Sequence, residues 1–467
     1  MSSLFFYGWW SPRYVPLLLA SILFSFVVSA GLTSPSLGRP RKKLLLFVSI
    51  FVHLLVLGFY KYGAFFLGAF LGLTGLEGSA YAGAVAVELP IGISFYTFTQ
   101  IAFLVDCWQG KVIERRLDHY LLFVTYFPHL IAGPILHHAQ MMPQFAKADI
   151  YKPRMEWIAR GVVIFVFGLS KKLLIADPMS VYANALFDQK LVLPTFFLSW
   201  LGTIFYAFQI YFDFSGYSDM AIGLSLFFGI KLPVNFNSPY KATSIIDFWR
   251  RWHISLSTFL RDYLYIPLGG NRYGAVRRYI NLFITMLLGG LWHGAGWTFI
   301  LWGGFHGLLL AINHAWQKVA KRDGRRHVVA KGLSWLVTFV CVCLAWVLFR
   351  AETLSQAIVV YKGMLGLNGL SLPEFFKDKV SFLKGAALVD YSGIWQGAQT
   401  QGDSTSFILL LLAGAICWGA KNLNKVSVQE NKVSFGVGQG VLIGGLFFLC
   451  LLHMASGAPA QFLYFRF

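Results

Sequence analysis

Residues 285–307 read TMLLGGLWHGAGWTFILWGGFHG, and the interpretation of the chain starts from them. They lie within a run that contains no Asp, Glu, Lys or Arg between Arg278 and Lys318. Such a run is long enough for two membrane crossings of about 20 residues each. In its middle His293 stands beside Trp292 and among several glycines. An imidazole at membrane depth costs free energy unless it faces a cavity or a partner, so we predict a reactive histidine in a polar hole within the bilayer.

The composition is that of a polytopic membrane protein. Of the 467 residues 57% are hydrophobic and only 13% are charged, too few to solvate a soluble protein of this length. The formal charge is +19, and its Lys and Arg form short clusters between apolar runs, as in cytoplasmic loops and in contacts with anionic lipid. This pattern argues against nucleic-acid binding. The five cysteines show no zinc-like spacing, and no cleavable signal peptide is evident.

The apolar runs predict an all-α chain with about 11–13 membrane segments, which we interpret as one integral-membrane domain over residues 1–467. The more polar residues 368–404 are expected to form an extramembrane insertion. The predicted segments are 15–33, 44–58, 61–75, 91–106, 119–136, 157–176, 193–212, 216–230, 279–292, 297–316, 332–349, 405–420 and 434–454.

Residues 245–264, IIDFWRRWHISLSTFLRDYL, differ from an ordinary span. Aromatic and aliphatic side chains recur at helical spacing on one face, while Asp247 and the arginines lie largely off it. We predict an amphipathic helix that lies at the interface or dips into the protein, within an amphipathic or re-entrant segment covering 244–272. His253 falls on the apolar face and is expected to point inward.

His293 is the strongest candidate for chemistry, because the sequence lacks soluble-enzyme motifs such as the P-loop, H-E-x-x-H and G-x-S-x-G. A neutral imidazole takes a proton from a hydroxyl near pH 7 and later returns it, which suits acyl transfer to an alcohol. The alternative is a histidine that fills a helix junction and bonds a backbone carbonyl.

The roles of two further histidines stay open. His306 either orients His293 or packs, and we favour packing. His253 is a second catalytic group, a ligand contact or a core residue. Zinc bound by all three is disfavoured, because no short-range pair has ligand spacing.

Three arginines, Arg250, Arg251 and Arg261, lie where the amphipathic segment meets the membrane. They either bind lipid headgroups or hold the phosphates of an acyl-carrier cofactor, because guanidinium groups match phosphate geometry. Asp213 and Asp219 in YFDFSGYSDM form a helix-boundary pair, an acceptor-binding site or a structural lock, and we favour a structural role.

These stretches resemble the membrane-bound O-acyltransferase (MBOAT) family, and within it the bacterial branch of alginate O-acetyltransferases and D-alanyl-lipoteichoic-acid transferases. The matching stretches span most of the chain in family order, and the central block is highly specific. They are TYFPHLIAGPI (125–135), QIYFDFSGYSDMAIG (209–223), LPVNFNSPYKA (232–242), SIIDFWRRWHISLSTFLRDYLYIPLGGNR (244–272), TMLLGGLWHGAGWTFILWGGFHG (285–307), VLFRAETLSQA (347–357) and FLYFRF (462–467).

The PLGGN motif and the length of the chain are similar to those of the alginate-type O-acetyltransferases. The resemblance places the family's essential histidine at His293 and its second motif histidine at His253, and we add Trp292 and Asn237 to the three arginines as cofactor-binding residues. It implies a ring of tilted helices around a central funnel that admits the acyl donor from the cytoplasmic side. FYGWW normally follows a full N-terminal helix in this branch but here begins at Phe6, so we expect a late start codon or a missing first span.

The resemblance therefore implies a multi-pass enzyme of the bacterial inner membrane. It would move an acetyl group from acetyl-CoA, without a metal, toward an alginate-like extracytoplasmic polysaccharide. Expected partners are membrane lipids, the polysaccharide and a periplasmic SGNH-type acetyltransferase. We expect His293 to act as general base, while His253 positions the reactants or polarises the thioester.

Two alternatives stay open. One is D-alanyl transfer to teichoic acid from a carrier protein. The other is a transporter or flippase, which would predict an internal repeat with paired broken helices; the sequence shows no such repeat.

Overall fold

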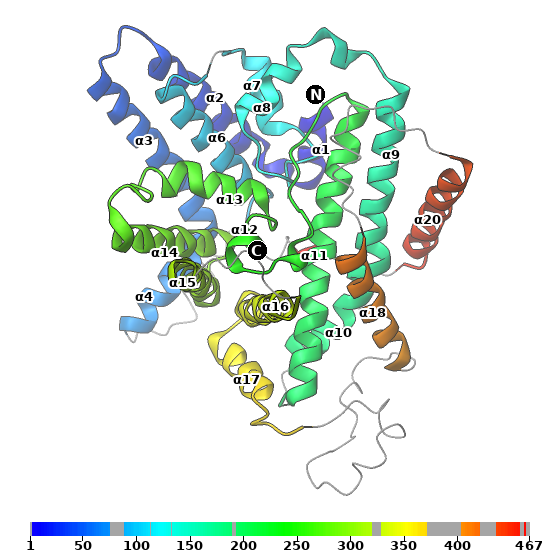
Figure 1. Cartoon of the computed structure of the whole chain (residues 1–467). Helices are drawn as coiled ribbons and strands as arrows, with labels where there is room; N and C mark the ends of the chain where they lie inside the picture. Colours follow the sequence, from blue (N-terminus) through cyan, green and yellow to red (C-terminus); the bar gives the residue numbers. More distant parts are fainter. Residues whose placement is uncertain are drawn as a thin grey trace, which may run out of the picture. The chain divides into compact units, whose positions relative to one another are not determined.

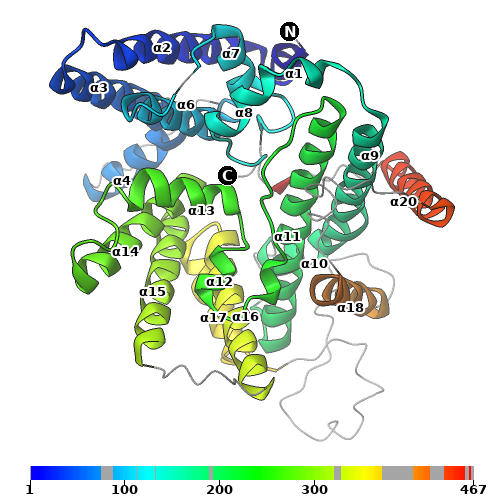
Figure 2. The same cartoon turned by 45° about the horizontal axis from the view of Figure 1, so that its top comes forward.

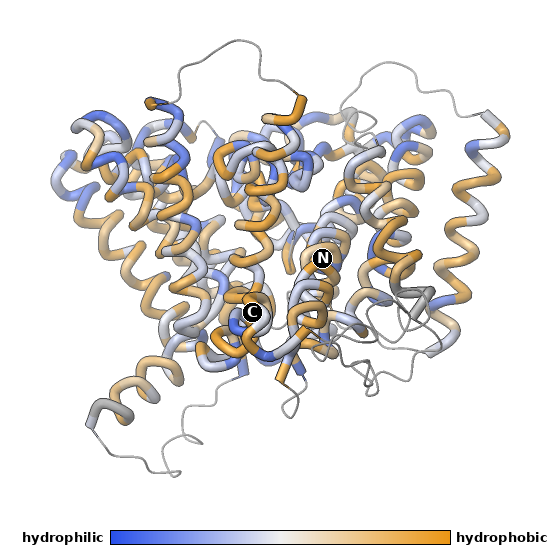
Figure 3. Tube along the Cα trace, turned by 60° about the horizontal axis from the view of Figure 1, so that its bottom comes forward, coloured by the Kyte–Doolittle hydropathy of each residue, from blue (hydrophilic) through white to orange (hydrophobic). Residues whose placement is uncertain are grey.

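The computed structural model describes residues 2–74, 88–112, 114–131, 133–188, 193–319, 328–370, 403–420, 436–457 and 462–463. Over these ranges the chain is helical and contains no strand (Figure 1). Long hydrophobic stretches run along the helices (Figure 3). The prediction of an all-α polytopic membrane protein is confirmed. Four helices in the described ranges are long and apolar enough to cross a membrane, namely Pro12–Thr33, Arg39–Leu71, Val328–Arg350 and Val437–Ala455.

The chain divides into two compact units, each assembled from separate parts of the sequence. Unit 1 comprises Met1–Phe165, Met220–Val234 and Thr258–Pro267, and unit 2 comprises Val166–Asp219, Asn235–Ser257 and Leu268–Phe467. The units alternate along the chain, so neither is a contiguous sequence domain.

Unit 1 contains a layer of three helices, α2 (Val15–Thr33), α3 (Arg39–Leu57) and α6 (Ile93–Trp108), which pack against one another (Figure 2). A hydrogen bond of 2.7 Å between Ser25 Oγ on α2 and His53 Nε2 on α3 provides a buried polar link. The remaining elements of this unit are α1 (Ser2–Trp10), η1 (Pro12–Tyr14), η2 (Gly58–Tyr62), α4 (Gly63–Thr74), α7 (Leu117–Thr125), α8 (His138–Phe145), η3 (Ala148–Tyr151) and η6 (Arg261–Tyr265).

Unit 2 contains the helices of the TMLLGGLWHGAGW stretch. Three further helices, α9 (Met155–Ser170), α11 (Phe196–Phe227) and α13 (Ile254–Leu260), contribute residues to both units. The elements that lie wholly in unit 2 are η4 (Lys171–Ala176), α10 (Asp177–Phe187), η5 (Pro239–Lys241), α12 (Ile245–Trp249), α14 (Gly274–His293), α15 (Trp297–Val319), α16 (Val328–Arg350), α17 (Leu354–Met364), α18 (Asp403–Gly419) and α20 (Val437–Ala455).

Helices α14 and α15 form the closest pair in unit 2, because glycines at their seam let the two backbones approach. A side chain at Gly290 would collide with the carbonyl of Phe299, and one at Gly303 would collide with the carbonyl of Met286. The seam holds the end of α14, where His293 lies, against α15.

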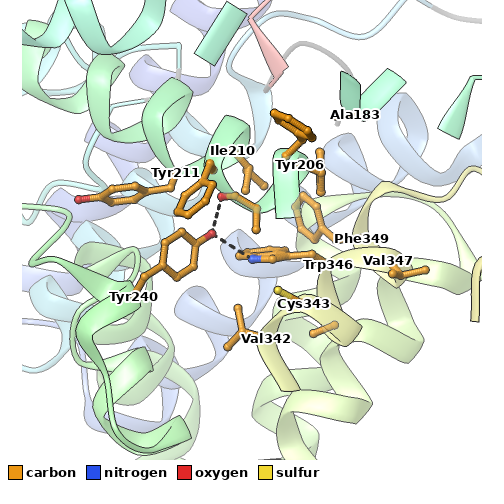
Figure 4. Packing of buried hydrophobic residues seen from close by; sticks show 14 of the residues in the cluster. Ala183, Tyr206, Ile210, Tyr211, Tyr240, Val342, Cys343, Trp346, Val347 and Phe349 are labelled. Atoms are coloured by element: carbon orange, nitrogen blue, oxygen red, sulfur yellow. Dashed lines mark hydrogen bonds between the residues drawn. The ribbon is translucent and has the colours of Figure 1, made fainter. Parts of the chain in front are cut away.

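An aromatic core joins η5, α11 and α16 within unit 2 (Figure 4). The Tyr240 hydroxyl donates to the carbonyl of Ala207 on α11, and Nε1 of Trp346 on α16 donates to the same hydroxyl at 3.2 Å. Both rings are buried. The two hydrogen bonds therefore satisfy a phenol that would be costly to bury alone, and they fix the segment that leads into α12.

The predicted spans 193–212 and 216–230 form one helix, α11, so the predicted break between them is wrong. Asp213 and Asp219 lie inside this helix, and each meets a lysine of η4. Lys172 Nζ lies 2.7 Å from Asp213 Oδ1, and Lys171 Nζ lies 2.5 Å from Asp219 Oδ2. Because the ion pairs compensate both carboxylates, the helix continues through them.

The helix predicted over 245–264 is also interrupted. Helix α12 ends at Trp249 and α13 begins at Ile254, with His253 between them. The predicted span 119–136 is helical only to the end of α7. Residues 371–402 of the predicted insertion lie outside the described residues. Helices α1, α8, α10 and α17 were not among the predicted segments.

Candidate active site

His253 lies at the break between α12 and α13 in a left-handed backbone conformation, with φ of 42°. This conformation costs a residue other than glycine about 1–3 kcal/mol, and such strain gathers at functional sites. Two backbone hydrogen bonds of 2.9 Å maintain the turn, from the Ile254 amide to the Asn235 carbonyl and from the Asn237 amide to the Arg251 carbonyl. The imidazole is fully buried.

Asn235 determines the tautomer of His253. Its Oδ1 accepts from the Ser255 amide at 3.2 Å and from Ser255 Oγ at 2.9 Å. A backbone amide can only donate, so the side-chain atom at this position is the oxygen. The same oxygen lies 3.1 Å from His253 Nδ1. A neutral His253 therefore carries its proton on Nδ1 and presents the lone pair of Nε2, which is buried without a hydrogen-bond partner in the described part of the chain.

His293 is the last residue of α14 and is 5% exposed. Its ring centroid lies 6.4 Å from that of His253 and 4.9 Å from that of Trp292. The rings of Trp302 and Phe349 meet it edge-on, each at 5.1 Å. Four segments of unit 2 thus bring the two predicted catalytic histidines together in an aromatic cage.

His306 takes part in the same cluster. Trp249 Nε1 donates to His306 Nδ1 at 3.2 Å, so a neutral His306 carries its proton on Nε2. Trp302 lies between the histidines, with its ring centroid 4.9 Å from that of His306. Nε2 of His306 and Nε1 of Trp302 are both buried donors without a hydrogen-bond partner in the described ranges. Whether His306 orients a reactant or only packs stays a prediction.

Among the described residues, the polar atoms of the cluster that have no hydrogen-bond partner include an acceptor on His253 and donors on His306 and Trp302. A buried polar group left unsatisfied costs about 1–3 kcal/mol. Such groups also occur elsewhere in the described chain, but here three of them lie beside the two predicted catalytic histidines, where a bound ligand would supply the missing partners. A hydroxyl would satisfy the acceptor, and a carbonyl oxygen would satisfy a donor.

The predicted phosphate-binding residues near α12 lie at the edge of this cluster. Arg251 pairs with Asp247 at 2.9 Å and donates to the carbonyl of Asn237 at 3.3 Å. Arg250 and Asn237 are exposed. These groups are accessible to a ligand, but their contact with a donor stays a prediction.

Arg261 and Trp292 lie in different units. Arg261 lies on η6 in unit 1 and pairs with Asp262 at 2.6 Å, whereas His253 belongs to unit 2. Trp292 is 4% exposed and contacts His293 directly. Among the described residues no group of three or more His, Cys, Asp or Glu could hold a metal ion.

Four residues of the cluster had no role assigned from the sequence, and Asn235 is the first of them. It differs from Asn237 in burial and in its bonds to His253 and Ser255, which spacing alone does not reveal. The others are Ser255, Trp249 and Trp302. The one available signal was the helical spacing that puts Trp249 and His253 on the same face.

Comparison with known proteins connects this geometry to a family. Residues 91–350 match the model of the MBOAT, membrane-bound O-acyltransferase family, and contain all three histidines. A peptidoglycan O-acetyltransferase of Helicobacter pylori is 45% identical over 410 residues, covering 82% of this chain and 76% of the relative. A probable alginate O-acetylase AlgI of Pseudomonas aeruginosa is 40% identical over 390 residues, covering 83% and 73%. A teichoic acid D-alanyltransferase of Streptococcus thermophilus is 30% identical over 280 residues, covering 56% and 68%.

Proposed function

The chain belongs to the membrane-bound O-acyltransferase family, and on that premise we propose that it transfers an acetyl group from acetyl-CoA toward a hydroxyl of an extracytoplasmic polysaccharide. The family membership confirms the resemblance found in the sequence and identifies a multi-pass O-acyltransferase. Relatives at 40–45% identity are named for O-acetylation of peptidoglycan or alginate, whereas the D-alanyltransferase is 30% identical over a shorter region. These identities support acetyl over D-alanyl as the acyl group.

The proposal places the enzyme in the bacterial inner membrane, with a periplasmic SGNH-type protein as the partner that completes polymer acetylation. The acceptor hydroxyl then belongs either to the polymer or to that partner. An alginate-like or peptidoglycan polymer is supported by the two named acetylating relatives.

The observation that carries the chemistry is the complementarity of the unused polar atoms. In the proposed reaction His293 takes the proton from the acceptor hydroxyl as its oxygen attacks the thioester carbonyl carbon. The tetrahedral intermediate collapses by breaking the carbon–sulfur bond, and protonated His293 returns the proton to the departing CoA thiolate. The acceptor leaves as an ester, and both charge and protons balance.

The tautomers refine the roles of the neighbouring rings. Neutral His253 presents a lone pair at Nε2, so it does not donate to the thioester carbonyl. The attacking hydroxyl has a single proton, which His293 takes, so His253 positions the acceptor by accepting a hydrogen bond from a neighbouring hydroxyl. The carbonyl oxygen, which gains negative charge during attack, requires donors instead. His306 Nε2 and Trp302 Nε1 are the unused donors of the cluster, and we assign them this role.

The test measures CoA release from acetyl-CoA by detergent-purified protein supplied with acetylatable polysaccharide. We expect His293→Ala to lower the rate about 10²–10⁴-fold, the usual contribution of a general base. His53→Ala is the matched control, because His53 is a buried histidine on α3 that bonds Ser25.

Two results would contradict the proposal. Equal rates in His293→Ala and wild type would remove His293 from the chemistry. Absence of CoA release from the wild-type protein, combined with acyl transfer from an aminoacylated carrier protein, would favour the D-alanyl reaction instead.

A further inference from the structure

Unit 1 contains a pocket of about 520 Å³ that the proposed reaction does not use. It lies where α8, the start of α9 and the residues after α11 meet. Its described lining includes four cationic residues and no acidic one. The four are Lys147, Lys152, Arg154 and Lys231. The pocket has the size of a small-molecule site and a single sign of charge.

The walls of this pocket are fixed by hydrogen bonds. Lys231 donates its amide to Gln144 Oε1 at 2.9 Å, and Gln144 Nε2 donates to the Lys231 carbonyl at 3.0 Å. Gly229 has φ of +68°, and a Cβ there would lie 3.3 Å from Cα of Ile150. The reciprocal amide pair and the close backbone approach hold these walls together.

An aromatic ring forms part of the lining. Lys231 Nζ lies 5.1 Å from the centroid of Trp157, a cation–π distance that keeps the ammonium group at the pocket. Glu156, in the first turn of α9, pairs with Arg160 at 2.5 Å. That carboxylate is therefore engaged along its own helix.

We propose that this pocket binds a phosphate ester, with the phosphate held by the four cationic side chains. Guanidinium and ammonium groups form charge-assisted hydrogen bonds with phosphate oxygens, and the bonds are strongest in partly enclosed sites. Loops rich in Lys and Arg face the cytoplasm, where the phosphate comes either from an anionic lipid headgroup or from a soluble metabolite. The inference rests on the pocket alone and does not depend on the proposed acetyl transfer.

The experiment compares the full-length protein with Lys147→Gln/Lys231→Gln. Both lysines are exposed and both backbone amides remain, so the Gln144 clamp is preserved. The matched control is Arg39→Gln/Arg41→Gln, which removes two exposed charges at the start of α3. One arm measures phosphatidylglycerol retained after extraction from phosphatidylglycerol–phosphatidylcholine nanodiscs, by native mass spectrometry. The other titrates purified protein with pyrophosphate and follows its melting temperature.

Each outcome decides the question. Loss of one retained phosphatidylglycerol in the pocket variant, but not in the control, supports a lipid headgroup. A pyrophosphate affinity that is about tenfold or more weaker in the pocket variant only supports a soluble phosphate ester. Equal lipid retention and equal pyrophosphate affinity in wild type and pocket variant overturn the proposal. An equal loss of binding in the control variant also overturns it, because the loss would then follow from net charge alone.

Discussion

Unit 2 contains two buried polar clusters, a charged one around η4 and a histidine one at the end of α14, and they differ in how their polar atoms are paired. In the charged cluster Lys172 meets Asp177 at 2.5 Å and Asp213 at 2.7 Å, and the Leu463 amide donates to Asp213 at 3.1 Å. In the histidine cluster several ring nitrogens have one partner or none within the described chain. Each carboxylate of the charged cluster thus meets a lysine, although Asp177 Oδ2 has no hydrogen-bond partner among the described residues. Neutralised carboxylates are expected of a structural lock, and unpaired neutral polar atoms of a site that receives a ligand.

The comparison predicts that the charged cluster controls stability. Lys172→Met leaves two buried carboxylates without their shared cation, and we expect a loss of about 3–5 kcal/mol in the free energy of unfolding. Thermal unfolding in detergent measures it, with Lys362→Met, an exposed lysine on α17, as control. A variant that unfolds like wild type but releases no CoA would show that the charged cluster takes part in the reaction and is not only structural.

The second prediction concerns the tautomer of His253. Asn235→Leu removes the acceptor that holds the Nδ1 proton, and we expect a loss of about 10–100-fold in turnover, as for other residues that orient a reactive imidazole. The matched variant is Asn237→Leu, which alters an exposed side chain of the same motif and is expected to change the Michaelis constant for the donor rather than turnover. Equal turnover in both variants would show that the tautomer has no role.

The third prediction separates backbone strain from chemistry at His253. His253→Gly and His253→Ala both remove the imidazole and should both lower turnover. Glycine adopts a positive φ freely, so we expect the glycine protein to be about 1–2 kcal/mol more stable than the alanine protein. Equal stabilities, compared by thermal unfolding, would mean that the left-handed turn relaxes without its histidine.

The smallest effect is expected at the edge of the histidine cluster. Arg251 and Asp247 are each about one third exposed, and an ion pair as exposed as this one contributes about 0–1 kcal/mol. Arg251→Gln should therefore leave the melting temperature nearly unchanged. A raised Michaelis constant for acetyl-CoA with unchanged turnover would identify Arg251 as a donor contact, and an unchanged one would leave it structural.

The sequence was sufficient for the family, through its motifs, and for the all-α class, because uncharged runs of this length have few physical solutions. The central role of the LWHGAG stretch stays a prediction. The sequence was insufficient where a contact with a residue distant in the sequence decides the local backbone conformation. Helix α11 continues through Asp213 and Asp219 because Lys171 and Lys172, some forty residues earlier, compensate them. The segments predicted from the sequence were instead divided at residues 213–215, which include Asp213.

The helix break at His253 could not be predicted from the sequence for a different reason. The spacing of IIDFWRRWHISLS is helical throughout, and nothing in it marks His253 for a left-handed conformation. The turn exists because Asn235 and Asn237, from another segment, bond the backbone on either side of it. Tertiary contacts therefore interrupt the helix that the local periodicity predicts.

The glycine seam between α14 and α15 has a consequence for deep mutational scanning. Gly290 and Gly303 have no chemical group to offer, yet a side chain of any size at either position would push a carbonyl of the opposite helix away. Such a scan would score both positions as intolerant as His293. Mutational intolerance in this stretch therefore does not by itself identify a catalytic residue. Measuring protein abundance alongside activity would distinguish variants whose helices cannot pack from variants that fold but lack the imidazole of His293.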